Sequence, residues 1–508
     1  MRDPETKWLI IIGLICLIYI GLRFWNLTAS CLWFDEIFSL HAAAHDWQSL
    51  FRFVAQDLIH PPLFYVLLKI WTAIGGESLV WVRCFPVFFS ILAVIPFILL
   101  CRELNLRLRV AALALTFFAV NGSLIKYAQE VRMYSLLMFF ALVSYWLFVR
   151  FLNSGKGFPF LLIVNVLLVY THYFGWFVVF SEVIAVAFVS RENLKRILLM
   201  TGVAFLSFTP WIYALWEASN INAAAAVGQN IGWMKKPNLL AILQFVYDLF
   251  EPIYFQQSNL DAPAILFLTL PIILLGIAAF VFWLANLKNE SREDRQNLIL
   301  LAIFTATPLL SAFVASWIAP YSIWGTRHLI IVFAPFAILL AIAFSKINII
   351  KLRTAALGLI FLLFAGAFVL QARQPQPDFI WCAWENLALD LRAEKNAKIY
   401  VFEDLIAYHF WFALREADAN FEVVKINGIE GLNEDKAYFL PRGFDKVKIA
   451  DENGITGERF FIAFRAKNWN ETQPPLKNLI QKGYTTGEPK VFEAQGLKAF
   501  LIEVKKTN

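Results

Sequence analysis

The sequence predicts an all-α polytopic membrane protein with a small C-terminal α/β soluble domain. Of its 508 residues, 59% are hydrophobic and 16% are charged, whereas soluble domains average about 45–50% apolar and about 25% charged residues. Apolar runs close to the roughly 20 residues that cross a bilayer recur as far as residue 372, and a more polar composition follows. The net charge of +6 comes from short basic clusters between these runs, which indicates orientation in a membrane and no nucleic-acid partner.

The apolar segments predict about eleven or more transmembrane helices. The first segment is too long for a typical signal sequence, and no small-residue cleavage site follows it, so we expect it to be retained as a span. The predicted spans are residues 8–27, 84–101, 110–121, 133–149, 159–171, 173–190, 197–216, 263–286, 297–316, 329–345 and 354–372.

Basic residues predict the orientation of these spans. If the N-terminus is cytoplasmic, most Lys and Arg residues fall in short inner loops, and the long outer loops contain fewer, which is the pattern of the positive-inside rule. The inner basic residues are Arg2, Lys7, Arg102, Arg107, Arg109, Arg150, Lys156, Arg191, Lys195, Arg196, Lys288, Arg292, Arg295, Lys346, Lys351 and Arg353. We therefore expect a multi-pass protein of the inner (plasma) membrane, and an odd number of spans places the C-terminus outside the cell.

The sequence divides into two predicted domains, a transmembrane domain over 1–372 and a soluble, extracytoplasmic domain over 373–508. The first contains long external loops at 28–83 and 217–263, in which amphipathic stretches predict helices along the membrane surface. A Pro-rich linker at 373–377 separates the domains. In the second domain, alternation of apolar and polar residues predicts four strands, and helical patterns between some of them predict two helices. The amphipathic stretches are 63–71 and 239–250; the strands are 398–403, 421–426, 459–465 and 498–504; the helices are 405–416 and 476–482.

Cysteine usage gives little information. The five cysteines contain no C-x-x-C pair and lie mostly in or beside apolar runs, where a free cysteine behaves as a small hydrophobic residue. We therefore predict neither a disulfide framework nor a cysteine-type zinc site.

Polar residues that would be costly inside a membrane gather in the outer loops. The first group is Trp33-Phe34-Asp35-Glu36, directly after the first span. Its two carboxylates are either solvated surface charges, or a general base for an acceptor hydroxyl or amine, or metal ligands. His41 and His45, four residues apart, could bind a metal on one helical face but are more often surface residues.

Further groups follow along the chain. His60 precedes a diproline that ends a loop and starts an amphipathic stretch. Glu130, Arg132 and Tyr134 lie between the third and fourth predicted spans, where they form either an anchoring belt or a site for an anionic headgroup, because guanidinium matches phosphate oxygens. His172 alone is typical of an interface, but Arg327 before the tenth span is a second phosphate candidate.

The order of these motifs resembles the membrane glycosyltransferases of the GT-C fold. More narrowly it is similar to the bacterial branch related to protein O-mannosyltransferases and the lipid A aminoarabinose transferase (glycosyltransferase families 39 and 83). The resemblance covers roughly residues 8–345 and leaves out the C-terminal domain. The matching motifs are Trp33-Phe-Asp-Glu36, His60-Pro-Pro-Leu63, Arg83, Gln129-Glu-x-Arg-x-Tyr134, Tyr170-Thr-His172 and Arg327-His328.

The resemblance implies an inverting transfer of a sugar from a polyprenyl-phosphate donor at an extracytoplasmic site. It implies Asp35 as the acid that activates the acceptor, Glu36 as its partner and Glu130 as the second-loop acid. Arg132 and Arg327 would contact the donor phosphate. The other predicted substrate-binding residues are His60 (where the aminoarabinose transferases usually have Lys), Arg83, Tyr134, His172 and His328.

The sequence leaves the cofactor, the acceptor and the class of function open. Some enzymes of this fold use a divalent metal and others do not, so a metal ion is a possible cofactor and the lipid-linked sugar is a substrate. The acceptor is a lipid, a glycan or a protein, and membrane lipids are further partners. A glycolipid or polysaccharide transporter or flippase is the main alternative, with Glu182 as its best mid-span charge; a surface-polysaccharide polymerase or ligase is another.

Overall fold

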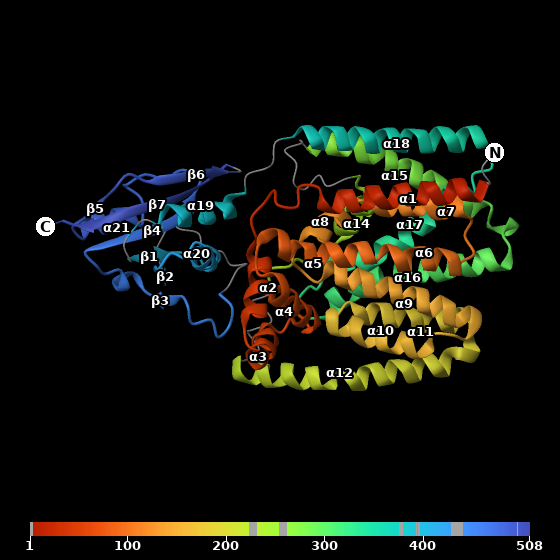
Figure 1. Ribbon diagram of the computed structural model, residues 1–508, viewed down its shortest axis with the longest axis horizontal. Coiled ribbons are helices and arrows are strands. Elements are labelled where there is room, and N and C mark those ends of the chain that lie inside the picture. The colour runs from red at the N-terminus through yellow and green to blue at the C-terminus, as the bar shows by residue number, and fades with distance from the viewer. Residues whose placement is uncertain are drawn as a thin grey trace. The chain divides into compact units, whose positions relative to one another are not determined.

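A computed structural model shows that the chain forms two compact units (Figure 1), each built from separate stretches of sequence. Unit 1 comprises Met1–Leu27, Leu58–Ile221 and Met234–Gln376, and unit 2 comprises Thr28–Asp57, Asn222–Trp233 and Pro377–Asn508. The residues that the structure describes are 4–222, 231–252, 262–374, 379–392, 394, 397–427, 440–494 and 496–507. Parts of the predicted loop 217–263 and of the predicted linker 373–377 lie outside them.

Unit 1 is a bundle of helices. Its helices are α1 (Pro4–Phe24), α4 (Leu63–Gly75), α5 (Leu79–Leu92), α6 (Val94–Glu103), α7 (Leu108–Val120), α8 (Gly122–Gln129), α9 (Tyr134–Ser154), α10 (Phe158–Thr171), α11 (Gly175–Val189), α12 (Leu194–Asn222), α14 (Leu239–Phe250), α15 (Ala262–Ala285), α16 (Arg292–Ile318), η4 (Thr326–Val332), α17 (Phe333–Ser345) and α18 (Ile350–Arg373). Each predicted span coincides with a helix or with a pair of consecutive helices, so the all-α polytopic prediction is confirmed.

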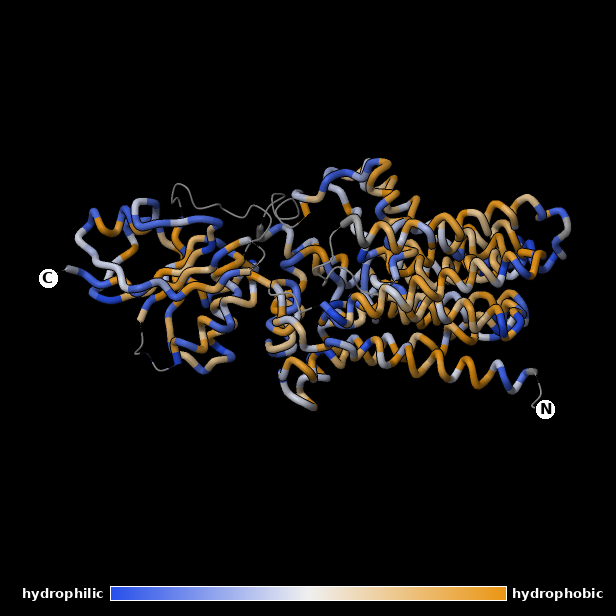
Figure 2. Tube along the Cα trace, turned by 90° about the horizontal axis from the view of Figure 1, so that it is seen from above, coloured by the Kyte–Doolittle hydropathy of each residue, from blue (hydrophilic) through white to orange (hydrophobic). Residues whose placement is uncertain are grey.

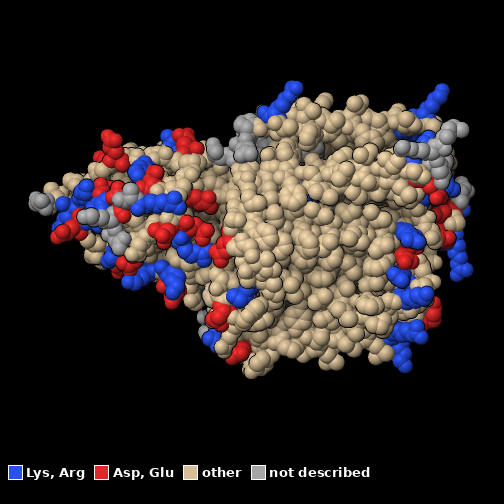
Figure 3. Space-filling model, viewed as in Figure 1, with Lys and Arg blue, Asp and Glu red and all other residues tan. Residues whose placement is uncertain are grey.

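Eight of the spans in the described part of the chain are long and apolar enough to cross a membrane. The helices over the other three predicted spans, α7, α10 and α11, have 13, 14 and 15 residues, so at 1.5 Å per residue they extend only about 20–23 Å. The helices of the bundle are mostly apolar (Figure 2), and on the face that Figure 3 shows they form a broad belt without charges, while charged side chains gather at the end where α1 begins. The chain is thus a multi-pass membrane protein by its helices.

Burial separates central from peripheral helices. In the span formed by η4 and α17, 89% of the most apolar stretch is buried, whereas the corresponding share is 17% in α1 and 28% in α18. Most apolar side chains on α1 and α18 therefore face outward, where the lipid of the bilayer would surround the bundle. The η4–α17 segment is consequently the most buried of these three spans. Its first residues include Arg327 and His328.

Unit 2 is an α/β fold that also includes two helices, α2 and α3, from the first predicted external loop. Its elements are α2 (Phe34–Ala44), α3 (Trp47–Asp57), α19 (Ala383–Asp390), β1 (Lys398–Val401), α20 (Asp404–Glu416), β2 (Glu422–Ile426), β3 (Lys448–Ala450), β4 (Arg459–Ala466), α21 (Leu476–Gln481), β5 (Tyr484–Thr486), β6 (Lys490–Ala494) and β7 (Leu497–Lys506). All four predicted strands and both predicted helices are present. The short strands β3, β5 and β6 escaped the prediction, since three to five residues show little alternation.

The described strands form one mixed sheet in the order β3-β2-β1-β4-β7-β5, with β6 also paired to β7. The pairs β1–β2, β1–β4 and β2–β3 are parallel, whereas β7 is antiparallel to its partners. Because successive side chains point to opposite faces, β1 contributes to two cores. Ile399 and Val401 pack under α19 and α20, while Tyr400 packs on the other face with Phe460 and Leu476.

A disulfide between Cys31 and Cys382 joins the loop before α2 to the segment before α19, with the two Cα atoms 5.5 Å apart. The prediction of no disulfide was therefore wrong. The two cysteines are separated by 351 residues, and no local spacing rule can detect such a pair. Cys16, Cys84 and Cys101 are free. The five cysteines therefore comprise one disulfide pair and three free thiols.

Candidate functional site

Four segments of unit 1 bring together a buried group of one arginine and three histidines, which we call the Arg–His cluster. Its members are His60, Arg132, His172 and His328, with exposed fractions of 8%, 2%, 3% and 8%. They come from the segment before α4, the α8–α9 connection, the α10–α11 turn and η4. All four are residues that the sequence predicted to bind substrate, and the folding of the chain places them side by side.

Arg132 is the fixed charge of the cluster. Its Nη2 atom lies 3.1 Å from His60 Nε2, and its Nη1 atom lies 3.5 Å from the hydroxyl of Tyr65. A guanidinium can only donate, so His60 Nε2 accepts and the ring proton belongs on Nδ1. His60 is therefore held as a neutral ring beside a permanent cation.

His172 has its tautomer set by the backbone. Its Nδ1 atom accepts the N–H of Phe174 at 3.1 Å, so the proton of the neutral ring is on Nε2. Burial lowers the pKa of His172 well below its ordinary value, and His60, Arg132 and Arg327 lower it further. This Nε2–H donor is buried and has no hydrogen-bond partner within the described residues.

Glycines at two turns allow these rings to approach. A Cβ atom at Gly175 would lie 2.7 Å from the carbonyl oxygen of Leu168, so the tight turn after His172 requires glycine. A Cβ atom at Gly325 would lie 2.9 Å from Nδ1 of His328. The rings of His172 and His328 are 4.9 Å apart, and Nδ1 of His328 has no hydrogen-bond partner in the described part of the chain.

Tyr134 and Arg327 extend the cluster. The buried ring of Tyr134 lies 6.0 Å from that of His328, and the guanidinium carbon of Arg327 lies 5.9 Å from the centre of the Tyr134 ring. Such an approach is a favourable cation–π contact. A second arginine is thus held beside the histidines, and it is less buried than Arg132.

Two other predicted residues of unit 1 have contacts of a structural kind. Glu130 is half-buried and forms an ion pair with Lys126, with 3.9 Å between Nζ and Oε1. Arg83, on α5, is buried and donates from Nη1 to the carbonyl oxygen of Leu27 at 2.8 Å. Arg83 therefore anchors the end of the first span to α5.

Asp35 and Glu36 belong to unit 2, at the first turn of α2. Asp35 is half-buried, and its carbonyl oxygen accepts the hydroxyl of Ser39. Glu36 is buried, and its Oε2 atom accepts the backbone N–H of Trp33 at 3.1 Å. A carboxylate in this position accepts a backbone N–H at the start of the helix, and its negative charge interacts favourably with the positive end of the helix dipole. Glu36 therefore stabilises the start of α2, which is the helix that presents Asp35.

Asp248 and Glu251, at the end of α14, are two acids that are not among the predicted site residues. Both are buried, with exposed fractions of 4% and 3%. Asn121 donates to the carbonyl oxygen of Asp248 at 2.9 Å, and Gln244 donates to the Asp248 carboxylate at 3.0 Å. Burial, and then the charge of Asp248, raises the pKa of Glu251 to about 8. Acids at the end of an otherwise apolar amphipathic stretch were the signal that could have identified them.

No protein-family model and no curated protein matches the chain. Its structure is similar to that of ArnT from Cupriavidus metallidurans, with a TM-score of 0.61 in the apo state and 0.59 in the state bound to undecaprenyl phosphate, at 11% identity and over 98% of both chains. It is also similar to the apo oligosaccharyltransferase of Archaeoglobus fulgidus, with a TM-score of 0.50 at 16% identity. That match covers 82% of this chain but only 64% of the archaeal enzyme. The fold is therefore the GT-C fold, and the likeness to ArnT extends over nearly the whole chain.

Proposed function

We propose that the chain is an integral membrane glycosyltransferase that moves a sugar from a polyprenyl-phosphate donor to an acceptor, with inversion. The observation that supports this most strongly is the Arg–His cluster. Arg132 and the Nε2–H of His172 are buried donors on a GT-C scaffold, and buried donors of this kind suit an anionic oxygen. ArnT, a structure with the same fold, is known with undecaprenyl phosphate bound. A lipid phosphate is the ligand that suits these donors best.

The proposed reaction is a single displacement. The acceptor oxygen or nitrogen forms a bond to the anomeric carbon while the bond from that carbon to the phosphate oxygen breaks. The electron pair leaves with the phosphate, and Arg132 and His172 stabilise the negative charge that develops there. We propose Asp35 as the base that takes the proton of the acceptor. Glu36 acts through α2 and is a positioning residue in this scheme.

Arg327, Tyr134, His60 and His328 complete the proposed donor site. Arg327 supplies a second positive charge, and its guanidinium is held against Tyr134. His60 keeps Arg132 in place through the 3.1 Å contact. Among the described residues, no group of three or more His, Cys, Asp or Glu side chains is arranged to hold a metal ion.

We further propose that unit 2 and the reaction are extracytoplasmic. The excess of basic residues in the predicted inner loops supports this orientation. The disulfide between Cys31 and Cys382 supports it independently, because disulfides persist in oxidising compartments and are rare in the cytosol. A Lys498→Cys variant, made after the three free cysteines are replaced by serine, should react with an impermeant thiol reagent from outside intact cells. Labelling only after the cells are opened would contradict the proposed orientation.

The test of the proposed reaction uses the purified full-length protein with a synthetic polyprenyl-phosphate sugar and a panel of lipid, glycan and peptide acceptors. Arg132→Lys should lower kcat by about 100-fold or more, as loss of an oxyanion donor does. Asp35→Asn should lower it by about 100- to 10,000-fold, as loss of a general base does. The exposed Arg191→Ala is the matched control and should keep full activity.

Different failures have different meanings in this assay. Unchanged turnover in Asp35→Asn would remove Asp35 as the base. Unchanged turnover and donor binding in Arg132→Lys would show that the Arg–His cluster is not the phosphate site. Movement of the glycolipid across a vesicle membrane without any transfer product would replace the enzyme with a flippase.

A further inference from the structure

A groove with a cavity volume of about 350 Å³ is present on unit 1, between α1, α7, the end of α17 and the start of α18. Its walls are mostly apolar, with side chains such as Ile15, Leu113 and Phe361. Its polar residues include Arg109 and Arg353, which lie near the first turns of α7 and α18. The groove is thus apolar along its length and basic at one end, over about two helical turns of α7.

The groove is separate from the Arg–His cluster. His328 lies in η4, and the helix that follows, α17, ends at Ser345 in the wall of the groove. Ser345 follows His328 by 17 positions of mostly helical chain, which corresponds to roughly 25 Å of helix. The two features therefore occupy opposite ends of one central span.

The basic end of the groove favours an anion for two independent reasons. Arg109 and Arg353 contribute fixed positive charges, and α1, α7 and α18 all begin at this end, so that the positive ends of their helix dipoles lie here. The one helix that ends here is α17, and Arg353 Nη1 donates to the carbonyl oxygen of its last residue, Ser345, at 3.2 Å. The local field at this end is therefore positive.

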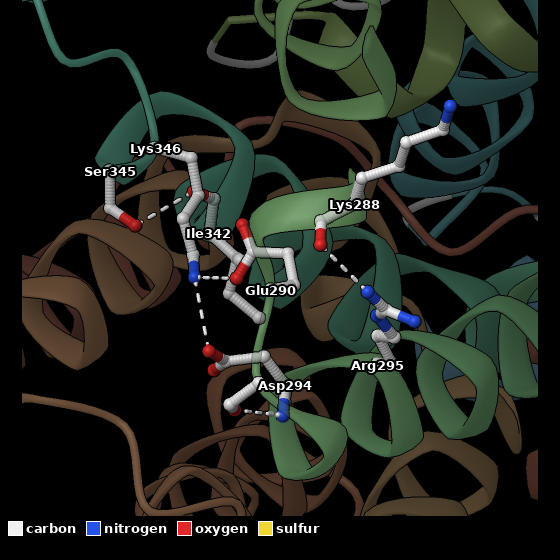
Figure 4. A network of polar contacts seen from close by, with 8 residues as sticks. Lys288, Glu290, Asp294, Arg295, Ile342, Ser345 and Lys346 are labelled. Atoms are coloured by element: carbon white, nitrogen blue, oxygen red, sulfur yellow. Dashed lines mark hydrogen bonds and ion pairs between the residues drawn. The ribbon is translucent and has the colours of Figure 1, made fainter. Parts of the chain in front are cut away.

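The nearby acids are already paired with another cation. Glu290 and Asp294 both contact the Lys346 amine, which points between them (Figure 4), and the distance from Nζ to Asp294 Oδ2 is 3.3 Å. No carboxylate of a described residue forms an ion pair with Arg109 or Arg353. Arg109 and the other N–H groups of Arg353, whose Nη1 donates to Ser345, are consequently available to an anionic ligand at the mouth of an apolar groove.

We propose that this groove binds an anionic phospholipid. The phosphate of the headgroup is held by Arg109 and Arg353, and one acyl chain lies along the apolar walls formed by α1, α7 and α18. A phospholipid satisfies both features at once, because a charged headgroup needs the arginines and a hydrocarbon chain needs the apolar groove. A small free anion would leave the apolar walls without a ligand.

The experiment is native mass spectrometry of the full-length protein in detergent, titrated with phosphatidylglycerol and, in parallel, with zwitterionic phosphatidylethanolamine. We expect one phosphatidylglycerol to bind at least tenfold more tightly than phosphatidylethanolamine. Arg109→Ala/Arg353→Ala should weaken its binding about tenfold or more. Arg102→Ala removes an exposed charge in the last turn of α6 that does not line the groove, and should bind as the wild type does.

A second variant protects the test against misfolding of the double mutant. Thr116→Phe keeps both arginines but fills the groove with a ring, and should also lose the bound lipid. Equal binding of both lipids, an equal loss in Arg102→Ala, or retained binding in both groove variants would overturn the proposal. Displacement of the lipid by stoichiometric undecaprenyl phosphate would also overturn it, and would assign the groove to the donor's carrier.

Discussion

At the scale of single residues, the Arg–His cluster depends on backbone positions as much as on its own side chains. His172 and His328 carry buried ring nitrogens without partners among the described residues, which is costly unless a ligand completes them. Their rings are close because glycine occupies positions 175 and 325, where any side chain would meet a neighbouring atom. The glycines are therefore part of the proposed site although neither has a side chain.

Gly325→Ala tests this dependence. The new methyl group would lie 2.9 Å from Nδ1 of His328 and must displace the ring. Because small misplacements of a reacting geometry cost up to about 100-fold, we expect kcat/KM to fall by about tenfold or more. Gly366→Ala in α18 is the matched control, since its Cβ would meet nothing within 4 Å. Equal activity of the two variants would show that His328 is not held in place by this contact.

Two buried histidines of unit 2 predict how stability changes with pH. Burial lowers the pKa of His41 to about 3, helped by His45 and Arg415, and burial lowers that of His409 to about 3. Their ordinary pKa is about 6.5, so between pH 6.5 and 3 the unfolded chain binds more protons than the folded one. Stability should therefore fall as the pH decreases below about 6.5, by roughly 1.4 kcal/mol per pH unit for each histidine at most.

The unfolding of full-length protein followed from pH 7 to pH 4 measures this slope. His41 donates to or accepts from the Tyr408 hydroxyl at 2.8 Å, so His41→Gln keeps a polar partner while it removes the titration. His409→Phe removes the titration of the second histidine. Each variant should flatten the pH dependence, and a wild-type stability that stays level or rises on acidification would disprove the assignment.

At the scale of elements, α9, α10 and α11 are joined by a buried polar ring. Ser144 Oγ lies 2.6 Å from both Asn165 Oδ1 and Glu182 Oε1, and Asn165 Nδ2 donates to Glu182 Oε2 at 2.7 Å. One hydroxyl has one proton, so the ring closes only if a protonated Glu182 donates to Ser144. Glu182, the best mid-span charge for a transporter, thus has hydrogen-bond partners on both carboxyl oxygens. These contacts indicate that it links helices.

Glu182→Gln and Glu182→Ala separate this explanation from a charged role. The glutamine can donate to Ser144 and accept from Asn165, so its thermal stability in detergent should be close to that of the wild type. Alanine leaves both partners unsatisfied and should cost about 1–3 kcal/mol. An equal loss of stability in both variants would mean that an ionised carboxylate is required.

At the scale of the whole molecule, the disulfide joins two stretches that are far apart in the chain. Under denaturing conditions a maleimide reagent should label three cysteines before reduction and five after it. Cys31→Ser should destabilise unit 2 by about 2–5 kcal/mol, as loss of a native disulfide does in small secreted domains. Cys84→Ser, which removes a free thiol, is the control. Five labelled cysteines before reduction would contradict the bond.

The sequence by itself determined the features that depend on local chemistry. An apolar run of sufficient length forms a helix in lipid because every backbone hydrogen bond must be satisfied within the segment, so the predicted spans coincide with helices from α1 to α18. Alternation likewise located β1, β2, β4 and β7. The residues of the Arg–His cluster could be named in advance, because charged and imidazole groups beside apolar spans are costly and stand out against their neighbours.

Only the tertiary structure decided which of those residues meet. His60, Arg132, His172 and His328 come from four connections, and their contacts depend on how α4, α9, α10 and η4 pack. The bond between Cys31 and Cys382 and the burial of Asp248 and Glu251 have the same origin. Contacts between residues hundreds of positions apart leave no periodic trace in one sequence, since they are fixed by the packing of whole elements.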